Sequence, residues 1–251
     1  MSDLITVQGV VISAMDVGEY DKRIVLLTRE RGKISAFAKG ARRMNSPFTA
    51  AADSFVFGEF TLYEGKSSYN LNHVNIYHHF VELASRQPEV FYGYYFLELA
   101  DYFGREGTDE REMMNLLYVT VKALLNPSID NHLIRCVFEL RTMAEQGMMP
   151  QLGACVLCGS DAGTKSSTFW FSQEEHGLVC DDCLKRSPDA VRISESALYA
   201  MQYIVSAPIG KLYTFALSDA VCREVSHLVR IYTARNTDRK FKSLQILEMM
   251  D

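Results

Sequence analysis

Residues 22–43 read KRIVLLTRERGKISAFAKGARR, and this stretch predicts a β-hairpin. Two runs rich in apolar and β-branched side chains, residues 22–29 and 33–38, flank a short turn that ends at Gly32. Further runs of the same character cover residues 4–15, 54–63 and 69–77. Five short strands joined by Gly-containing turns are typical of a small β-barrel, and among five-stranded barrels the OB-fold is the expected one.

The same stretch is locally basic in a chain whose net charge is −5. Glu30 is its single acid, against eight Lys and Arg side chains. Such a local excess of positive charge indicates a surface for an anionic partner, although a solvated charged face is the alternative. The candidate nucleic-acid contacts are Lys22, Arg23, Arg31, Lys33, Lys39, Arg42 and Arg43. The candidate aromatics for base stacking are Phe37, Phe48, Phe55 and Tyr63, although core positions are expected for most of them.

After residue 78 the apolar side chains take up helical spacing. The expected helices cover residues 81–102, 109–125, 128–146, 194–203 and 217–234. Their wide apolar faces imply that they pack against one another. The sequence therefore predicts an α+β protein of two domains, an OB-fold domain at 1–79 and an α-helical domain at 80–251.

Four cysteines in the second half have the spacing of a metal site. Cys155 and Cys158 form one C-x2-C pair, and Cys180 and Cys183 form the other. Two such pairs can wrap one Zn²⁺ in a tetrahedron of thiolates, and in a reducing cytosol this pattern favours metal over disulfides. We expect a zinc module at residues 152–186, inserted in the helical domain, with His176 on an exposed hairpin beside it.

No enzyme signature accompanies this zinc site. Four cysteines would close the coordination shell, whereas a catalytic zinc keeps one position open. The chain contains no H-x-E or G-x-S-x-G motif, and Phe60 stands where a P-loop ending at Gly65-Lys66-Ser67 needs its first glycine. Cys136 and Cys222 are expected as small buried side chains on apolar helix faces. We predict a structural zinc ion and no catalytic residue.

A second basic cluster follows the last expected helix. Its members could contact a partner protein or DNA, or could simply be solvated: they are Arg235, Arg239, Lys240 and Lys242. The N-terminus has no signal-peptide pattern, and no run of eighteen apolar residues occurs. A cytoplasmic protein without membrane contact is therefore expected.

Several motifs together resemble the RecO family of bacterial recombination mediator proteins. The matching pieces, in order, are Gly9-Val10-Val11, Leu27-Thr28 with Gly32-Lys33, Ala38-Lys39-Gly40-Ala41-Arg42-Arg43, the two C-x2-C pairs of zinc-bearing members, and the tail Arg239-Lys240-Phe241-Lys242-Ser243-Leu244. The resemblance extends along nearly the whole chain. The chain departs from the family in the charge of residues 1–80. Nine basic side chains there meet eight acidic ones, a net charge of only +1, whereas OB domains of the family are often more basic.

This resemblance implies an N-terminal OB domain and a helical domain that carries the zinc module. It also implies binding of single- and double-stranded DNA, annealing of complementary strands, and a nucleoid-associated protein of the cytoplasm. The implied partners are RecR, the acidic C-terminal tail of single-strand DNA-binding protein and, indirectly, the RecA recombinase. The expected function is a recombination mediator in DNA repair that helps to load RecA onto coated single strands.

Two other functions stay open from the residues. A zinc-stabilised adaptor for protein partners would use the helical domain and the basic tail without direct DNA binding. A zinc hydrolase or nuclease would need an open metal position, and its cysteine variants would lose activity without unfolding.

Overall fold

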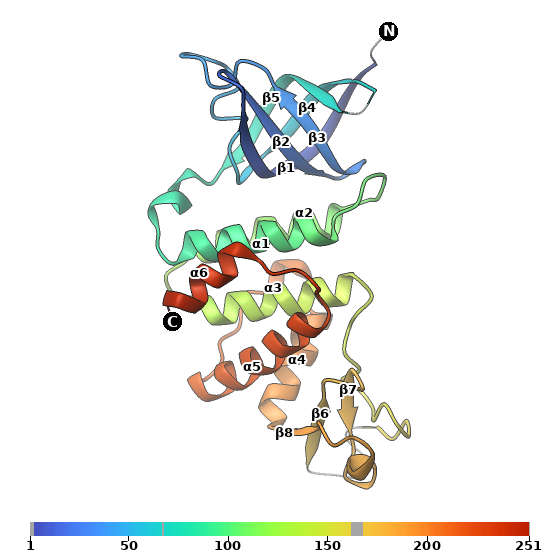
Figure 1. The fold of residues 1–251 in the computed structure, drawn as a ribbon. Helices are drawn as coiled ribbons and strands as arrows, with labels where there is room; N and C mark the ends of the chain where they lie inside the picture. Colours follow the sequence, from blue (N-terminus) through green and yellow to red (C-terminus); the bar gives the residue numbers. More distant parts are fainter. Residues whose placement is uncertain (1–2, 67, 162–167, 251) are drawn as a thin grey trace. The chain divides into compact units, whose positions relative to one another are not determined.

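A computed structural model describes residues 3–66, 68–161 and 168–250 of the chain. The chain divides into two compact units, of which the first comprises Met1–Leu125 with Lys240–Asp251 and the second Asn126–Arg239. The C-terminal residues thus belong to the same unit as the N-terminal barrel (Figure 1). The domain division at residues 79 and 80 stays a prediction.

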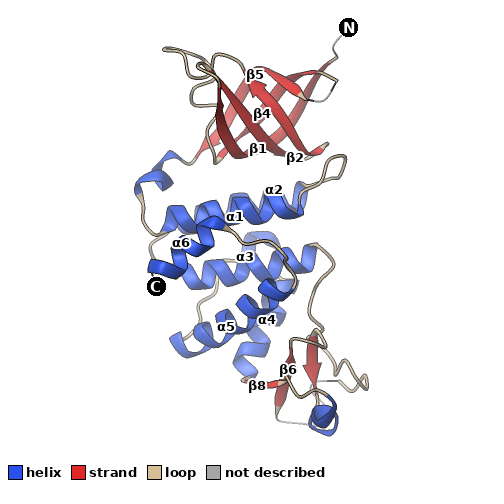
Figure 2. Ribbon diagram, in the orientation of Figure 1, coloured by secondary structure: helices blue, strands red, loops and turns tan. Residues whose placement is uncertain are grey.

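The N-terminal strands, drawn in red in Figure 2, close into a barrel. Their order around it is β1-β2-β3-β5-β4. The strands are β1 (Leu4–Val17), β2 (Asp21–Thr28), β3 (Gly32–Ala38), β4 (Val56–Glu64) and β5 (Tyr69–His79). β3 lies parallel to β5, and every other neighbouring pair in the barrel is antiparallel. This five-stranded barrel confirms the predicted OB-like architecture.

The barrel core follows from the alternation of side chains along each strand. β3 alternates strictly between buried and half-buried residues, as a strand with one face inside requires. Leu26, Ile34, Phe60 and Leu62 fill the interior. Residues 39–55 contain no helix; instead, turns bring Ala41 and Ala52 into the core and pack Phe48 against it.

The first unit also contains helices that follow the barrel. They are the 3-10 helix η1 (Val81–Ser85), α1 (Glu89–Phe103), α2 (Arg111–Leu124) and α6 (Lys242–Met250). The single helix predicted over residues 81–102 is wrong, because it is interrupted at Pro88, whose ring nitrogen cannot donate a helical hydrogen bond. The sequence pattern did not predict α6. This helix packs against α1, and the preceding Phe241 contacts the ring of Tyr95 on α1.

The second unit combines a helical group with a small sheet. Its helices are α3 (Asn131–Glu145), α4 (Glu195–Ser206), η3 (Ile209–Lys211) and α5 (Asp219–Arg235), and its remaining elements are β6 (Phe169–Ser172), β7 (Gly177–Val179), η2 (Asp181–Arg186) and β8 (Val191–Ile193). The side chains of Asp130, Ser194 and Ser218 cap the starts of α3, α4 and α5. The predicted β6–β7 hairpin is confirmed, and β8 adds an unpredicted third strand.

Among the described residues, no helix is both long enough and apolar enough to cross a membrane.

Candidate metal centre and nucleic-acid interface

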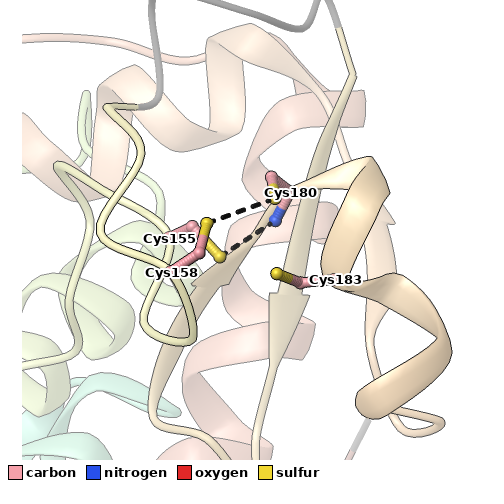
Figure 3. A group of neighbouring side chains, drawn as sticks. All are labelled: Cys155, Cys158, Cys180 and Cys183. Atoms are coloured by element: carbon pink, nitrogen blue, oxygen red, sulfur yellow. Dashed lines mark hydrogen bonds between the residues drawn. The ribbon is translucent and has the colours of Figure 1, made fainter.

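The four predicted cysteines converge in the second unit (Figure 3). Their sulfur atoms all lie within 4.8 Å of one another. The Sγ atoms of Cys158 and Cys180, one from each C-x2-C pair, are 3.7 Å apart. Sulfurs at the corners of a tetrahedron with Zn–S bonds of about 2.3 Å would be separated by about 3.8 Å. The donor set and its spacing therefore fit one zinc ion.

Each pair is shaped by a tight turn that its sequence supports. The amide of Gly159 donates to the carbonyl of Cys155 at 2.8 Å, and Gly159 has a φ of +73°, which side chains rarely adopt. In the second turn, the amide of Cys183 donates to the carbonyl of Cys180 at 3.0 Å. The amide of Cys180 also points at the sulfur of Cys155, 3.4 Å away. These turns hold the sulfurs toward a common point.

A small core supports the two turns. Val179 and Trp170 pack with the buried Cys155 and Cys183. The indole nitrogen of Trp170 donates to Asp181 Oδ1 at 2.7 Å, which ties the second turn to β6. The β6–β7 hairpin thus places both cysteine pairs, and the cluster is part of the fold of this segment.

The thiols differ in how readily they ionise. Hydrogen bonding to Ser160, whose hydroxyl lies 3.2 Å from the sulfur, lowers the pKa of Cys158 to about 6. Burial, followed by the neighbouring thiols, raises the pKa of Cys183 to about 12. Burial also raises the pKa of Cys180. Four thiolates at this spacing would repel one another strongly, so a bound cation is what would allow all four to ionise.

The other candidates near this site stay outside it. His176 is exposed at the turn of the β6–β7 hairpin, as expected, and the described cluster does not include it. Cys136 is buried on α3, where desolvation raises its pKa well above the usual value. Cys222 is half-buried on α5, with its sulfur 3.9 Å from Asp130 Oδ1.

The basic hairpin carries its cations at two different ends. In the β2–β3 register Lys22 lies opposite Ala38, and Thr28 lies opposite Gly32. Six residues of strand separate these ends, a distance of about 20 Å at roughly 3.3 Å per residue. The structure therefore divides the seven predicted contacts, with Arg31 and Lys33 at the turn and the other five at the open end of the hairpin.

At the turn, both cations are engaged within the first unit. The Nζ of Lys33 donates to the carbonyl of Asp101 at 2.6 Å and lies 3.3 Å from its carboxylate. Arg31 lies 3.4 Å from both Glu64 Oε2 and the hydroxyl of Tyr69. Lys33 thus joins β3 to α1, which is a structural role.

At the open end, two further cations are paired. Lys22 binds Asp53 Oδ1 at 2.6 Å and also donates to the carbonyl of Ala52, so it holds the β3–β4 connection. Arg42 lies 3.3 Å from Asp16 Oδ2 and donates to the carbonyl of Gly18 at 3.1 Å. These carboxylates partly offset the positive charge that both side chains present to an anionic partner.

Three cations at this end stay exposed and, in the described part of the chain, have no carboxylate partner: Arg23, Lys39 and Arg43. Arg43 lies over the ring of Tyr20, 5.1 Å from its centroid, and Tyr20 is 44% exposed. We call Tyr20, Arg23, Lys39 and Arg43 the rim cluster. Sequence reasoning missed Tyr20, although its place in the turn between two strands would have indicated exposure.

The aromatic side chains named from the sequence are mostly unsuited to stacking. Phe55 is buried, Phe48 packs against the barrel core, and Phe37 is half-buried on β3. Tyr63 is exposed, but it lies on β4, which is not a neighbour of the basic β2–β3 hairpin in the barrel. Tyr20 is the exposed aromatic residue that contacts a cation of the hairpin.

The C-terminal basic cluster is divided between the units. Arg235 belongs to the second unit, where it lies 3.6 Å from Glu174 Oε1. Lys240 and Lys242 are exposed in the first unit on either side of the buried Phe241. Arg239 is also exposed and makes contacts of its own.

Two family models match the chain in sequence. Residues 1–80 match the model described as "Recombination protein O N terminal", and residues 89–245 match "Recombination protein O C terminal". The chain belongs to the RecO family. The barrel and the helices that follow it thus correspond to the two parts by which the RecO family is described, and the resemblance seen in the motifs is confirmed.

Curated relatives agree with this assignment over nearly their whole length. A protein of Symbiobacterium thermophilum is 31% identical, with 98% of each chain covered. A protein of Alkaliphilus metalliredigens is 30% identical over 97% of this chain and 98% of its own. Each is named DNA repair protein RecO. Membership of the RecO family supports a role in DNA repair.

Proposed function

We propose that this chain is a DNA-binding recombination mediator without catalytic activity. It would bind single- and double-stranded DNA, anneal complementary strands and, with RecR, help to load RecA onto strands coated by single-strand DNA-binding protein. The observation that carries the proposal is the rim cluster, three exposed cations at one end of an OB-like barrel, of which Arg43 lies over the exposed ring of Tyr20. Family membership supplies the context of DNA repair.

The mechanism follows from the chemistry of the rim cluster. Arg23, Lys39 and Arg43 would neutralise phosphates without reading base sequence, and the face of Tyr20 would receive a base. Strands whose charge is neutralised repel each other less, so complementary strands can pair. Three phosphate contacts predict that log K falls with log salt at a slope of about −2 for single strands.

The remaining predicted contacts would assist more weakly. Lys22 and Arg42 are paired with carboxylates and keep the loops of this end in place. Arg31 and Lys33 would contribute mainly to stability. We propose the domain bounds that the sequence predicts, an OB domain at residues 1–79 and a helical domain at residues 80–251.

Zinc would serve as a structural ion. Cys155, Cys158, Cys180 and Cys183 would hold one Zn²⁺ in a closed shell at residues 152–186. The ion would cancel the repulsion between the four thiolates and join the two turns. No position would be left for a substrate, which supports a stabilising role.

A second function has one observation in its favour. Lys240 and Lys242 are exposed on either side of an anchored Phe241, so the tail presents positive charge from a fixed position. An acidic peptide, such as the tail of single-strand DNA-binding protein, would suit it. An adaptor that binds protein partners without DNA is therefore the alternative.

Strand annealing tests the proposal directly. Complementary oligonucleotides are coated with single-strand DNA-binding protein, and duplex formation is followed with and without the protein. We expect faster annealing that needs no nucleotide and gives no cleavage products. The variant Lys39→Gln/Arg43→Gln should be slower. A protein with intact zinc that neither binds nor anneals DNA would leave only the adaptor.

A further inference from the structure

The barrel leaves one long strand edge open. β3 and β5 are joined by only two residue pairs, Ala36 with Tyr69 and Phe37 with Asn70. β4 pairs with β5 from Tyr69 to His79. Within the described residues, the strand from Leu71 onward therefore has a strand neighbour on one side only. Its other side presents backbone N–H and C=O groups that no strand partner takes up.

The comparable open edges of the barrel are covered by their own surroundings. On β1, the carbonyl of Gln8 accepts from the amide of Arg29 at 2.9 Å, and its amide donates to Glu30 Oε2 at 3.1 Å. On β3, the amide of Lys33 donates to the carbonyl of Arg105 at 2.9 Å. In the part of the chain that the structure describes, no backbone bond of this kind covers residues 73–77.

The side chains of this strand do not protect its edge. Residues 70–79 read NLNHVNIYHH, without Lys, Arg, Asp, Glu or Pro. Charged side chains and proline are the usual means by which exposed edges avoid pairing with another chain. His73 and Asn75 are exposed, as are Ile76 at 37% and Tyr77 at 48%. Val74 is half-buried and packs against the barrel core, so the side of the strand that faces away from the core and its unpaired edge are the parts that stay open.

The segment is chemically self-complementary about Asn75. If two copies align antiparallel with Asn75 opposite Asn75, Val74 meets Ile76 and His73 meets Tyr77. The pairs are then amide with amide, apolar with apolar and aromatic with aromatic, all of which stabilise neighbouring strands. No like charges from Lys, Arg, Asp or Glu come together. A strongly charged partner strand would find no opposite charge on this segment.

We propose that the β5 edge, residues 73–77, pairs with the same edge of a second copy of this chain. The two strands run antiparallel about a two-fold axis at Asn75, so that the interface uses the same surface on both copies. Each barrel thereby continues its sheet into the other. The proposal rests on the strand edge alone and does not depend on DNA binding.

Two irregularities limit the length of the pairing. The β4–β5 register shifts between Thr61 and Leu62 and again between Phe57 and Gly58. These shifts leave Asn72 and Tyr77 without an opposite residue on β4. The pairing is therefore short, and a short interface predicts a weak dimer that forms as the protein concentration rises.

Sedimentation of the full chain tests the proposal, at concentrations from about 1 µM to about 500 µM. We expect a monomer–dimer equilibrium that Asn75→Lys abolishes, because it places two ammonium groups opposite each other. The matched control is Thr6→Lys, at an exposed position of β1 in the same barrel. A monomer throughout this range overturns the proposal. A dimer that Asn75→Lys leaves intact also overturns it.

Disulfide trapping gives an independent measurement. Opposite residues of antiparallel strands have Cα atoms roughly 4.5–5.5 Å apart, within the range that a disulfide spans. Asn75→Cys should therefore give a covalent dimer under mild oxidation, whereas Thr6→Cys should not. Equal trapping of both variants contradicts the two-fold pairing. Capture of an unrelated extended peptide by a chain that stays monomeric also contradicts it.

Discussion

The cysteine module and the basic hairpin gather their functional atoms in opposite ways. The module brings four sulfurs from two separate turns to within 4.8 Å of one another. The hairpin spreads its cations over two ends and pairs several of them with carboxylates. Coordination of one ion requires convergence, whereas attraction to a long polyanion requires only available charge. Carboxylates close to each cation therefore decide which cations of the hairpin remain available to an anionic partner.

The largest expected effect concerns the cysteine module. Cys183→Ser removes one of the four proposed zinc ligands, and the segment at 152–186 should lose its zinc and unfold. Structural zinc in small modules contributes roughly 10–16 kcal/mol of apparent binding free energy at neutral pH. Zinc content per chain and limited proteolysis measure the outcome.

The control for this variant is Cys222→Ser, which lies outside the cluster and should keep its zinc. A folded, protease-resistant module in Cys183→Ser would show that the metal does not hold the segment together. Loss of a catalytic activity without unfolding would instead support the alternative hypothesis that the chain is a zinc hydrolase or nuclease.

The next effect separates the two ends of the hairpin. Lys39→Gln/Arg43→Gln removes two available cations, and each charge-assisted contact is worth about 1.5–3 kcal/mol. Single-strand affinity should fall roughly 100-fold or more, with a salt slope shallower by about 1.4. Fluorescence anisotropy at several salt concentrations measures both quantities.

Its matched control, Arg31→Gln/Lys33→Gln, removes the same number of charges from the turn. Because these cations are held by Glu64 and Asp101, affinity should change little. Equal losses of affinity from the two double variants would mean that DNA contacts both ends of the hairpin. The rim cluster would then not be the main DNA-binding surface.

A smaller effect is expected from the exposed ring of the rim cluster. Tyr20→Ala should weaken single-strand binding by about 1–3 kcal/mol, the range for one base stacked on an aromatic side chain. Duplex affinity should hardly change, since paired bases present no free face. Parallel titrations with single strands and duplex provide the measurement. Tyr63→Ala, at an exposed position of β4, is the control, and an equal loss there would remove Tyr20 from the proposed role.

The smallest effect concerns stability at the turn. Lys33→Met should lower the free energy of unfolding by about 1 kcal/mol, because the hydrogen bond from its Nζ to the carbonyl of Asp101 is lost. Urea denaturation measures the change, and DNA affinity of the folded protein should stay close to that of the parent. A large loss of affinity with unchanged stability would place Lys33 among the DNA contacts.

Local patterns in the sequence predicted the parts of the fold that local chemistry determines. Alternating side chains located the five strands, and the C-x2-C spacing located the four cysteines that cluster. Pro88 in the middle of an expected helix was itself a local signal of interruption. α6 escaped because its nine residues become helical beside α1, where Phe241 packs on Tyr95 and Tyr102.

The availability of each cation lay beyond the sequence. Lys33 and Asp101 are 68 positions apart, and Lys22 and Asp53 are 31 apart. No local sequence pattern predicts these ion pairs, because their residues come together only when the barrel closes and α1 packs against it. Tyr20 was missed for a related reason, because its candidate role depends on Arg43, which contacts its ring from the turns that follow β3.

The return of the C-terminal residues to the first unit has a consequence for synthesis. Residues 240–251 leave the ribosome more than a hundred residues after Leu125, yet they complete the unit that residues 1–125 begin. Until then Tyr95 of α1 lacks its edge-on contact with the ring of Phe241. A chain truncated after Arg239 would keep every predicted DNA contact of the barrel but would lack the residues that complete the first unit.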